Sequence, residues 1–417
     1  MNEAVTHSLH TAFEKGDVTA IRATLTSNPS LRSLINSPIG PFDTYPISNV
    51  RSPEMLDLLL EFGADINAKS KWWAGGFCLL DSADDTLAQH AIQRGARVEI
   101  HAAARLGMTD RLRELISANP SLVNAPGGDG KRPLHFARTV EIAKLLLDHG
   151  AEVDAKDIDH ESTPAQYQIE NHHDIVRLLL ERGAKTDLFM AAALGDLDLV
   201  EKHLRENPKA IRQRIDGTTF PMSNHRAGGT IYNWTLGRDF SPHQVANKFG
   251  NKKVLEYLFS QSPLDIQLIN SCLLHDERAV KTLLEKNPKI SAEISHSDRR
   301  VLPNAARDRD HIALRLFLEA GISVDARGQH NATALHWAAW HGDAKAVDLL
   351  LRHKAPLEIA DNDFQSTPLH WTMHGSENGW HRNEGNYPEV ARLLLKAGAK
   401  IPDKIFGTPE VQNAFKR

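Results

Sequence analysis

Three acidic side chains in unusual settings are the candidates for catalysis in this sequence. Asp159 and Glu161 flank His160, and Glu377 lies in the tryptophan-containing stretch "HGSENGWHRNEGNYP" (374–388). Two carboxylates that flank an aromatic surface suit hydrolysis of a glycosidic bond, one as general acid and the other as base or nucleophile. This chemistry would require Glu377 to meet Asp159 or Glu161 in the folded chain.

The segment 217–240 gathers polar and aromatic side chains around the Gly228-Gly229 pair. These glycines allow a tight turn, but they do not form a phosphate-binding loop, because no GxxxxGK[ST] pattern follows. We expect a ligand-binding loop, because ordered loops of this length are usually functional; the alternative is an irregular spacer between two repeats. Its candidate ligand-binding residues are His225, Arg226, Tyr232, Trp234, Arg238 and Asp239.

Two further segments, 154–167 and 359–371, share the pattern D-x-D-x-x-S-T-P. An Asp before a turn usually accepts hydrogen bonds from its own backbone, and Ser or Thr before Pro often caps a helix. The alternative is a binding site that includes His160, because Asp159, His160 and Glu161 form a dense group of acid/base side chains. Paired aspartates can bind Ca²⁺, but the spacing of an EF-hand is absent.

No metal site or cofactor is predicted. The chain has two cysteines without a CxxC pattern, and it contains no HExxH motif. A disulfide framework and a structural zinc site are therefore not expected.

The composition describes a folded, weakly acidic protein. The 417 residues are 41% hydrophobic and 24% charged, with a formal net charge of −4. No basic excess points to nucleic acid, and no apolar run approaches the length of a membrane span. Residues 1–20 lack the apolar region of a secretory signal, so we expect a cytoplasmic, bacterial-type protein.

A repeated pattern runs through the chain. The endings "LLLEFGADINA" (58–68), "LLLDHGAEVDA" (145–155) and "LLLERGAKTDL" (178–188) are copies of one another, and 33 residues separate Gly150 from Gly183. Repeats of this length stack into solenoids, because a single copy cannot bury its own apolar face. We expect one continuous array in four sets, namely 1–100, 101–187, 188–266 with the insertion 217–240, and 267–417 with the insertion 375–387.

Each copy predicts two short helices. The first carries small residues such as Ala338-Ala339, which let a neighbouring helix approach closely. The second buries a stripe that in one copy comprises Val347, Leu349, Leu350 and Leu351. The predicted fold class is therefore all-α.

The stretch "ATALHWAAWHGDAKAVDLLLRHKA" (332–355) resembles an ankyrin repeat, whose usual core is T-P-L-H-x-A-A-x-x-G-H followed by V-x-L-L-L and G-A. Similar stretches occur at 132–157, 241–259 and 366–371. We count about twelve copies along the chain. The resemblance implies an ankyrin-repeat solenoid of stacked helix pairs, with short β-hairpin fingers and a concave groove. It also implies that the histidine of each L-H pair, as in His336, has a structural role.

The resemblance places a column of aromatic residues in the groove. Aligned copies put Tyr167, Trp337 and Trp371 at the position after the L-H pair, where small or polar residues are usual, and Tyr167 is therefore also a ligand-binding candidate. Packing between neighbouring copies is one explanation, and an aromatic groove for a peptide side chain, a planar ligand or a sugar is the other. Trp340, His374, Trp380 and His381 complete the ligand-binding candidates.

Two functions follow from these patterns. The first is a recognition scaffold that binds a protein or a small ligand, including a carbohydrate, in an aromatic-lined concave groove. The second is a hydrolase built on the array, with a glycoside hydrolase as the first choice. The sequence leaves both open, because a fold does not fix a function.

Overall fold

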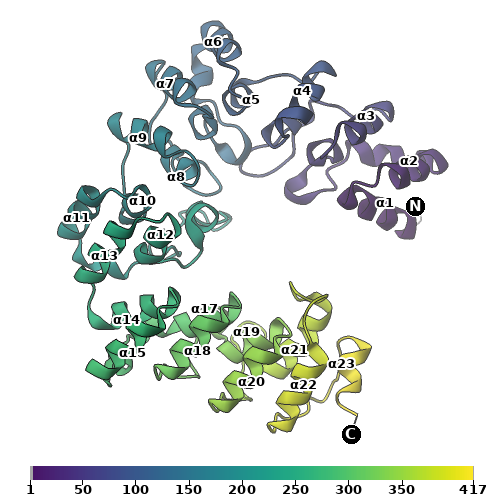
Figure 1. Cartoon of the computed structure of the whole chain (residues 1–417). Helices are drawn as coiled ribbons and strands as arrows, with labels where there is room; N and C mark the ends of the chain where they lie inside the picture. The colour runs from purple at the N-terminus through teal and green to yellow at the C-terminus, as the bar shows by residue number, and fades with distance from the viewer. Residues whose placement is uncertain (1–2, 417) are drawn as a thin grey trace. The chain divides into compact units, whose positions relative to one another are not determined.

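The computed structural model describes residues 3–416 as an all-α protein of short helices (Figure 1). Contacts divide the chain into an N-terminal unit, Met1–Val254, and a C-terminal unit, Leu255–Arg417, at helix α13 (Lys252–Gln261). The predicted all-α class is confirmed. The predicted β-hairpin fingers are not, because residues 3–416 form turns and short 3-10 helices where strands were expected.

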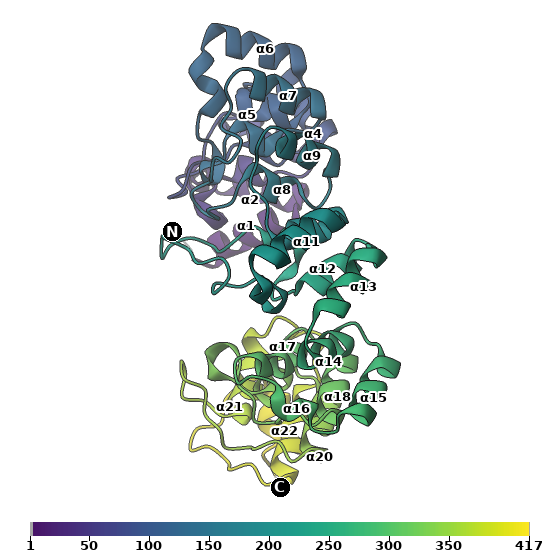
Figure 2. The same ribbon diagram turned by 90° about the vertical axis from the view of Figure 1, so that its left-hand side faces the viewer.

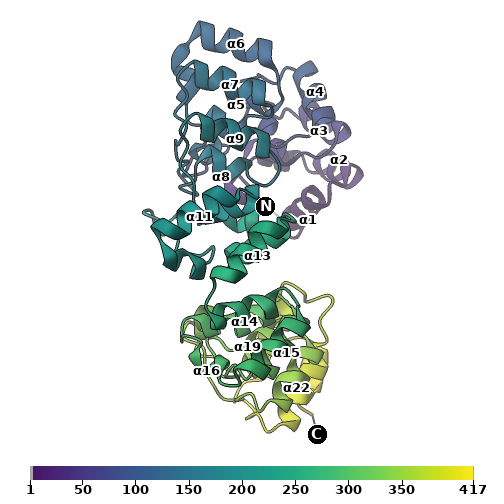
Figure 3. The same ribbon diagram turned by 60° about the vertical axis from the view of Figure 1, so that its left-hand side comes forward.

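The N-terminal unit is built from paired helices joined by turns, and α7 and α9 lie side by side in it (Figure 3). Its helices are α1 (Glu3–Lys15), α2 (Val18–Ser27), α3 (Pro53–Glu61), α4 (Asp85–Gln93), α5 (Ile100–Arg105), α6 (Thr109–Ala118), α7 (Val140–Asp148), α8 (Pro164–Gln168), α9 (His173–Glu181), α10 (Leu188–Leu194), α11 (Leu197–Glu206) and α12 (Pro242–Lys248).

The C-terminal unit repeats the same pairing. Helix α19 packs between α17 and α21, and α20 packs between α18 and α22 (Figure 1). Figure 2 views this unit from the side of α14 and α15. The helices of this unit are α14 (Leu264–Leu273), α15 (Glu277–Lys286), α16 (Ile290–Glu293), α17 (Val301–Arg307), α18 (His311–Glu319), α19 (Ala334–Trp340), α20 (Ala344–Arg352), α21 (Pro368–Asn378), α22 (Tyr387–Lys396) and α23 (Pro409–Asn413). Among the helices of residues 3–416, none is long and apolar enough to cross a membrane.

Side-chain caps start the helices where the sequence pattern places them. The Asp343 carboxylate accepts a hydrogen bond from Ala346 N at 3.1 Å at the start of α20. At the start of α19, His336 Nδ1 accepts one from Thr333 N at 3.1 Å, and His336 Nε2 donates to the Ser366 carbonyl at 3.1 Å. The L-H histidine therefore links two neighbouring copies through their backbones, as the repeat pattern predicts.

The apolar stripe of α20 is narrower than the sequence analysis predicted. Val347 and Leu350 are fully buried, whereas Leu349 and Leu351 lie half-buried at the edge of the core. Ala338 and Ala339 on α19 are also fully buried. Their small side chains allow α17 and α21 to approach α19 closely.

The insertion 375–387 begins with helix rather than loop. Helix α21 continues to Asn378, so only residues 379–386 connect it to α22. Gly375 makes this extension possible, because a Cβ atom there would lie 2.6 Å from the Trp340 carbonyl oxygen. The Tyr387 hydroxyl donates a hydrogen bond to the same carbonyl at 3.0 Å, which ties the end of the insertion to α19.

Candidate functional site

The C-terminal unit contains a cavity of about 350 Å³ with mostly aromatic walls. Helices α19 and α21, the loop after α21 and the turns 328–331 and 361–366 contribute most of the lining. The lining residues are His330, Trp337, Trp340, Phe364, Ser366, His370, Trp371, His374, Trp380 and Phe406. Five of the predicted ligand-binding residues therefore meet here, one of them from the insertion.

The tryptophan rings of the cavity stand nearly perpendicular or parallel to one another. The Trp371 ring lies 5.2 Å from that of Trp337 at 83° and 6.1 Å from that of Trp340 at 74°. The Trp380 ring stacks on Trp337 at 5.9 Å and 29°. Edge-to-face and stacked pairs are the favoured arrangements of aromatic rings, so these contacts stabilise the walls of the cavity.

Trp337 and Trp371 line the cavity, but both side chains are nearly buried. Their exposed fractions are 3% and 7%, because the adjacent rings cover them. The indole N–H of Trp371 donates to Asp361 Oδ2 at 2.9 Å. Trp380 is 64% exposed, and it is the most exposed of the four tryptophans that line this cavity.

Hydrogen bonds keep the carboxylate beneath Trp371 ionised. Burial acts to raise the pKa of Asp361, but donors from Phe364, Trp371 and Ser366 outweigh burial and hold this pKa below its usual value. Asp157 is the equivalent residue in the N-terminal unit, and it accepts from His160 N, Ser162 N and the Tyr167 hydroxyl. The prediction that these aspartates bond their own backbone is confirmed.

Apart from Trp380, the residues of the 375–387 insertion lie outside the cavity lining. Glu377 is exposed on α21. The His381 ring lies 5.1 Å from the His341 ring, and His381 Nδ1 lies 3.4 Å from Glu384 Oε2. The sequence analysis predicted that Glu377 and His381 are presented to a ligand, and that stays a prediction.

In the N-terminal unit, the insertion 217–240 packs against the turn 157–162. Gly228 N donates to the Asp159 carbonyl at 2.9 Å, and Ile231 N donates to Ser162 Oγ at 3.1 Å. The Trp234 ring lies 4.9 Å from the His160 ring. Two segments that depart from the repeat pattern therefore form one structure.

Glu161 holds the tip of this insertion. Its Oε1 atom accepts hydrogen bonds from Ser223 N at 2.8 Å, Ser223 Oγ at 2.6 Å and Asn224 N at 2.9 Å. Burial acts to raise the pKa of Glu161, but these three donors outweigh burial and hold the pKa below its usual value. The contacts account for Glu161 as an anchor of the loop, and its predicted catalytic role stays a prediction.

We expect Glu161→Gln to loosen the tip of the insertion. An amide oxygen accepts weaker hydrogen bonds than a carboxylate does, so hydrogen exchange of the Ser223 and Asn224 amides at pH 7 should rise roughly tenfold. Exchange measured by mass spectrometry on peptides that cover 220–226 tests this. Glu377→Gln, which changes an exposed glutamate in the other unit, is the matched control.

The same contact should weaken in acid. Because the pKa of Glu161 is lowered by folding, the contact contributes fully above the unfolded-chain pKa of about 4.3 and is lost as the pH falls through the lower folded value. Exchange rates at Ser223, corrected for the intrinsic effect of pH, should therefore rise below about pH 4. If the exchange rate at Ser223 rose equally in acid in Glu161→Gln, which has no carboxylate at this position, the explanation would be contradicted.

The remaining candidates of the insertion lie in different environments. Tyr232 is fully buried, and its hydroxyl donates to Asp187 Oδ2 at 3.0 Å, so the expectation that it faces a ligand is wrong. The Arg226 guanidinium lies 4.5 Å from the centre of the Trp73 ring. The backbone carbonyl of Asp239 accepts from Arg214 at 2.8 Å. His225, Trp234 and Arg238 are exposed.

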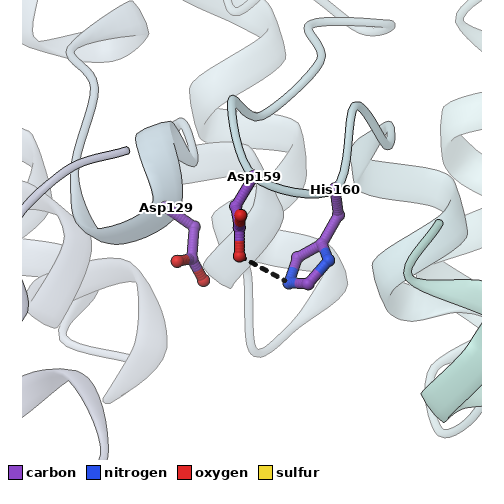
Figure 4. A group of neighbouring side chains, drawn as sticks. All are labelled: Asp129, Asp159 and His160. Atoms are coloured by element: carbon purple, nitrogen blue, oxygen red, sulfur yellow. Dashed lines mark ion pairs between the residues drawn. The ribbon is translucent and has the colours of Figure 1, made fainter. Parts of the chain in front are cut away.

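The sequence analysis missed Asp129. This residue lies in the turn 127–131 with a left-handed φ of 58°, and its carboxylate faces Asp159 and His160 (Figure 4). Burial and the Asp129 charge raise the pKa of Asp159, although His160 opposes them. The Asp-Gly step within "GGDGK" signals a turn, but nothing in the spacing connects that turn to residue 159.

The catalytic pair predicted from the sequence is divided between the two units. Asp159 and Glu161 belong to the N-terminal unit, and Glu377 belongs to the C-terminal unit. Among the described residues, the lining of the aromatic cavity includes none of the three. Their pairing stays a prediction.

The stacked helix pairs and the capped L-H turns define a helical repeat protein. A family model described as "Ankyrin repeats (3 copies)" matches residues 100–189, 268–363 and 302–405, which together exceed half of the chain. The chain therefore belongs to the ankyrin-repeat family.

Curated relatives match this chain over short regions. Inversin of Canis lupus familiaris is 28% identical over 142 residues, which is 34% of this chain and 12% of inversin. Palmitoyltransferase AKR1 of Saccharomyces cerevisiae is 34% identical over 84 residues, which is 20% of this chain and 9% of that protein. The ankyrin repeat protein FPV244 of fowlpox virus is 22% identical over 182 residues, covering 43% of this chain and 25% of its own length. The chain thus spans a quarter or less of each.

Proposed function

We propose that this protein is a recognition scaffold whose C-terminal unit receives an apolar or aromatic part of a partner protein in its aromatic cavity. The observation that carries the proposal is the cavity of about 350 Å³ walled by four tryptophans. Concave, mostly apolar sites with few polar groups are typical binding sites. Membership of the ankyrin-repeat family favours a protein partner, because solenoids present extended surfaces for recognition.

The exposed Trp380 gives this cavity its anchor. Most of its ring is in water, although the side facing the protein stacks on Trp337. Aromatic side chains that become covered on binding commonly contribute most of the binding energy. The buried Trp337 and Trp371 form the wall against which an occupant would pack.

The lining of the cavity favours an uncharged occupant. It consists of tryptophan, phenylalanine, histidine and one serine, and among the described residues it includes no carboxylate, lysine or arginine. An apolar or aromatic peptide side chain fits this surface, and the apolar face of a sugar also stacks on indole rings. A set of soluble oligosaccharides is therefore included in the test as the alternative ligand class.

In the test, peptides that bind the full chain are selected from a display library. Their affinity for the chain is then measured by titration calorimetry. Trp380→Ala is expected to weaken the binding of the best peptides at least about tenfold. Its melting temperature should stay close to that of the wild type, because the side chain is mostly exposed. Trp234→Ala, which removes an exposed tryptophan from the N-terminal unit, should leave affinity unchanged. Selected peptides that bind equally to wild type and Trp380→Ala would overturn the proposed site.

A further inference from the structure

Three side chains of the N-terminal unit direct metal-ligating atoms toward one point (Figure 4). Asp129 lies in the turn 127–131, and Asp159 and His160 lie in the turn 157–162. One ligand atom from each of them lies within 4.8 Å of the other two. Both aspartates are more than nine-tenths buried, and small side-chain movements would let a single ion contact all three groups.

The hydrogen bond between His160 and the Gly229 carbonyl determines which ring nitrogen of His160 carries the hydrogen. Nδ1 lies 2.8 Å from the Gly229 carbonyl oxygen, and a carbonyl only accepts, so Nδ1 carries the hydrogen. In the neutral ring Nε2 then presents its lone pair, 3.6 Å from Asp159 Oδ2. A lone pair and a carboxylate oxygen repel each other unless a proton or a metal ion lies between them. Metal-bound histidines usually donate their other N–H to a carbonyl or carboxylate in this manner.

The equivalent positions of the C-terminal unit carry an imidazole and a carboxylate. The D-x-D-x-x-S-T-P pattern aligns Asp363 with Asp159, and the preceding turns align His330 with Asp129. These turns share their backbone geometry, with φ of 61° at His330 and 58° at Asp129. His330 pairs with Asp363, whereas two carboxylates occupy the same places in the N-terminal unit.

The charges around the N-terminal cluster favour a divalent cation. Lys131 Nζ lies 3.4 Å from Asp129 Oδ2, and it also lies 4.9 Å from the centre of the Phe136 ring. Asp157, which is close enough to influence Asp159, adds a third carboxylate. Three carboxylates beside one ammonium leave an excess of two negative charges. Lys131 uses one oxygen of Asp129, so the other oxygen is available to a metal.

We propose that Asp129, Asp159 and His160 form a binding site for a divalent transition-metal ion, with Zn²⁺ as the best fit. Imidazole nitrogen and carboxylate oxygen are both ordinary zinc ligands, whereas Mg²⁺ and Ca²⁺ prefer oxygen alone. Three protein ligands leave the fourth tetrahedral position for water or a further ligand. Nothing in this site depends on the aromatic cavity of the C-terminal unit.

Such an ion would join three segments of the N-terminal unit. Asp129 brings the turn 127–131, Asp159 and His160 bring the turn 157–162, and the Gly229 carbonyl behind His160 brings the insertion 217–240. Because metal binding to the folded chain shifts the folding equilibrium by mass action, the ion should also stabilise the N-terminal unit.

The test uses the full chain after removal of metals with a chelator. Titration calorimetry with ZnCl₂ should give one site per chain, and Co²⁺ should give the visible absorption of a coordinated ion. Asp129→Asn, Asp159→Asn and His160→Gln should each weaken Zn²⁺ binding at least about tenfold, since even outer-shell changes at metal sites cost that much. Circular dichroism identifies any variant that fails to fold, and the Asn variants are nearly isosteric with Asp.

Two controls make the result decisive. His225→Gln removes an exposed histidine from the insertion 217–240, which packs against the proposed site. Asp363→Asn changes the residue of the C-terminal unit that is equivalent to Asp159. Both variants should bind Zn²⁺ as the wild type does. The proposal is overturned if Zn²⁺ gives no binding heat up to about millimolar concentration, the weak end of protein affinities. It is also overturned if the His225 variant loses the site while the Asp159 and His160 variants keep it. The first result would leave only the direct contact between Asp159 and His160.

Discussion

Trp371→Ala is expected to lower the free energy of unfolding by about 3–5 kcal/mol, the usual range for truncating a buried tryptophan. The side chain is almost completely buried between Trp337 and Trp340. Its removal leaves a cavity and also deprives the buried Asp361 of the indole donor, and a buried carboxylate that loses a donor is costly. Urea denaturation of the full chain, followed by circular dichroism, measures the change.

Trp380→Ala is the matched control for this prediction. It removes the same side chain from the same cavity, but most of that side chain is in water. The free energy of unfolding should therefore fall by clearly less, about 0.5–1.5 kcal/mol for the lost ring contacts with Trp337 and Trp340. If Trp371→Ala were as stable as wild type, Trp371 would be an exposed groove residue and the packing described above would be wrong.

Leu350→Ala is expected to cost about 2–5 kcal/mol, because this side chain is fully buried within the stacked helices of the C-terminal unit. Leu349→Ala, one residue earlier on α20, should cost clearly less, because Leu349 is only half-buried. Both variants remove the same atoms from the same helix, so differences in helix propensity cancel. Equal losses in urea denaturation would show that the covering of Leu350 by neighbouring helices is not as described.

The two sites divide the functional hypotheses between the two units. The aromatic cavity of the C-terminal unit suits recognition of an apolar group. The Asp129, Asp159 and His160 cluster of the N-terminal unit suits a metal ion. Each site includes a segment that departs from the repeat pattern, which agrees with the general rule that departures from local consistency mark functional or strained positions. The experiments on one site do not affect the interpretation of the other.

The repeat itself could be predicted from the sequence alone. The 33-residue period, the small residues of the first helices and the L-H histidines are local signals. A helix cap such as Asp343 acts within three residues of its own position. Local hydrogen bonds and periodicity therefore determined the all-α class, the helix pairs and the structural role of His336.

Only the tertiary structure decided how deeply each side chain is covered and which loops meet. Periodicity places Trp337 and Trp371 on one face, but neighbouring rings from another copy determine that they are buried while Trp380 is not. The bond between His160 and Gly229 joins residues 69 positions apart, and Asp129 reaches Asp159 from the preceding turn. Such contacts depend on how one copy stacks on the next, and this stacking geometry is not encoded in the spacing of residues within a single copy.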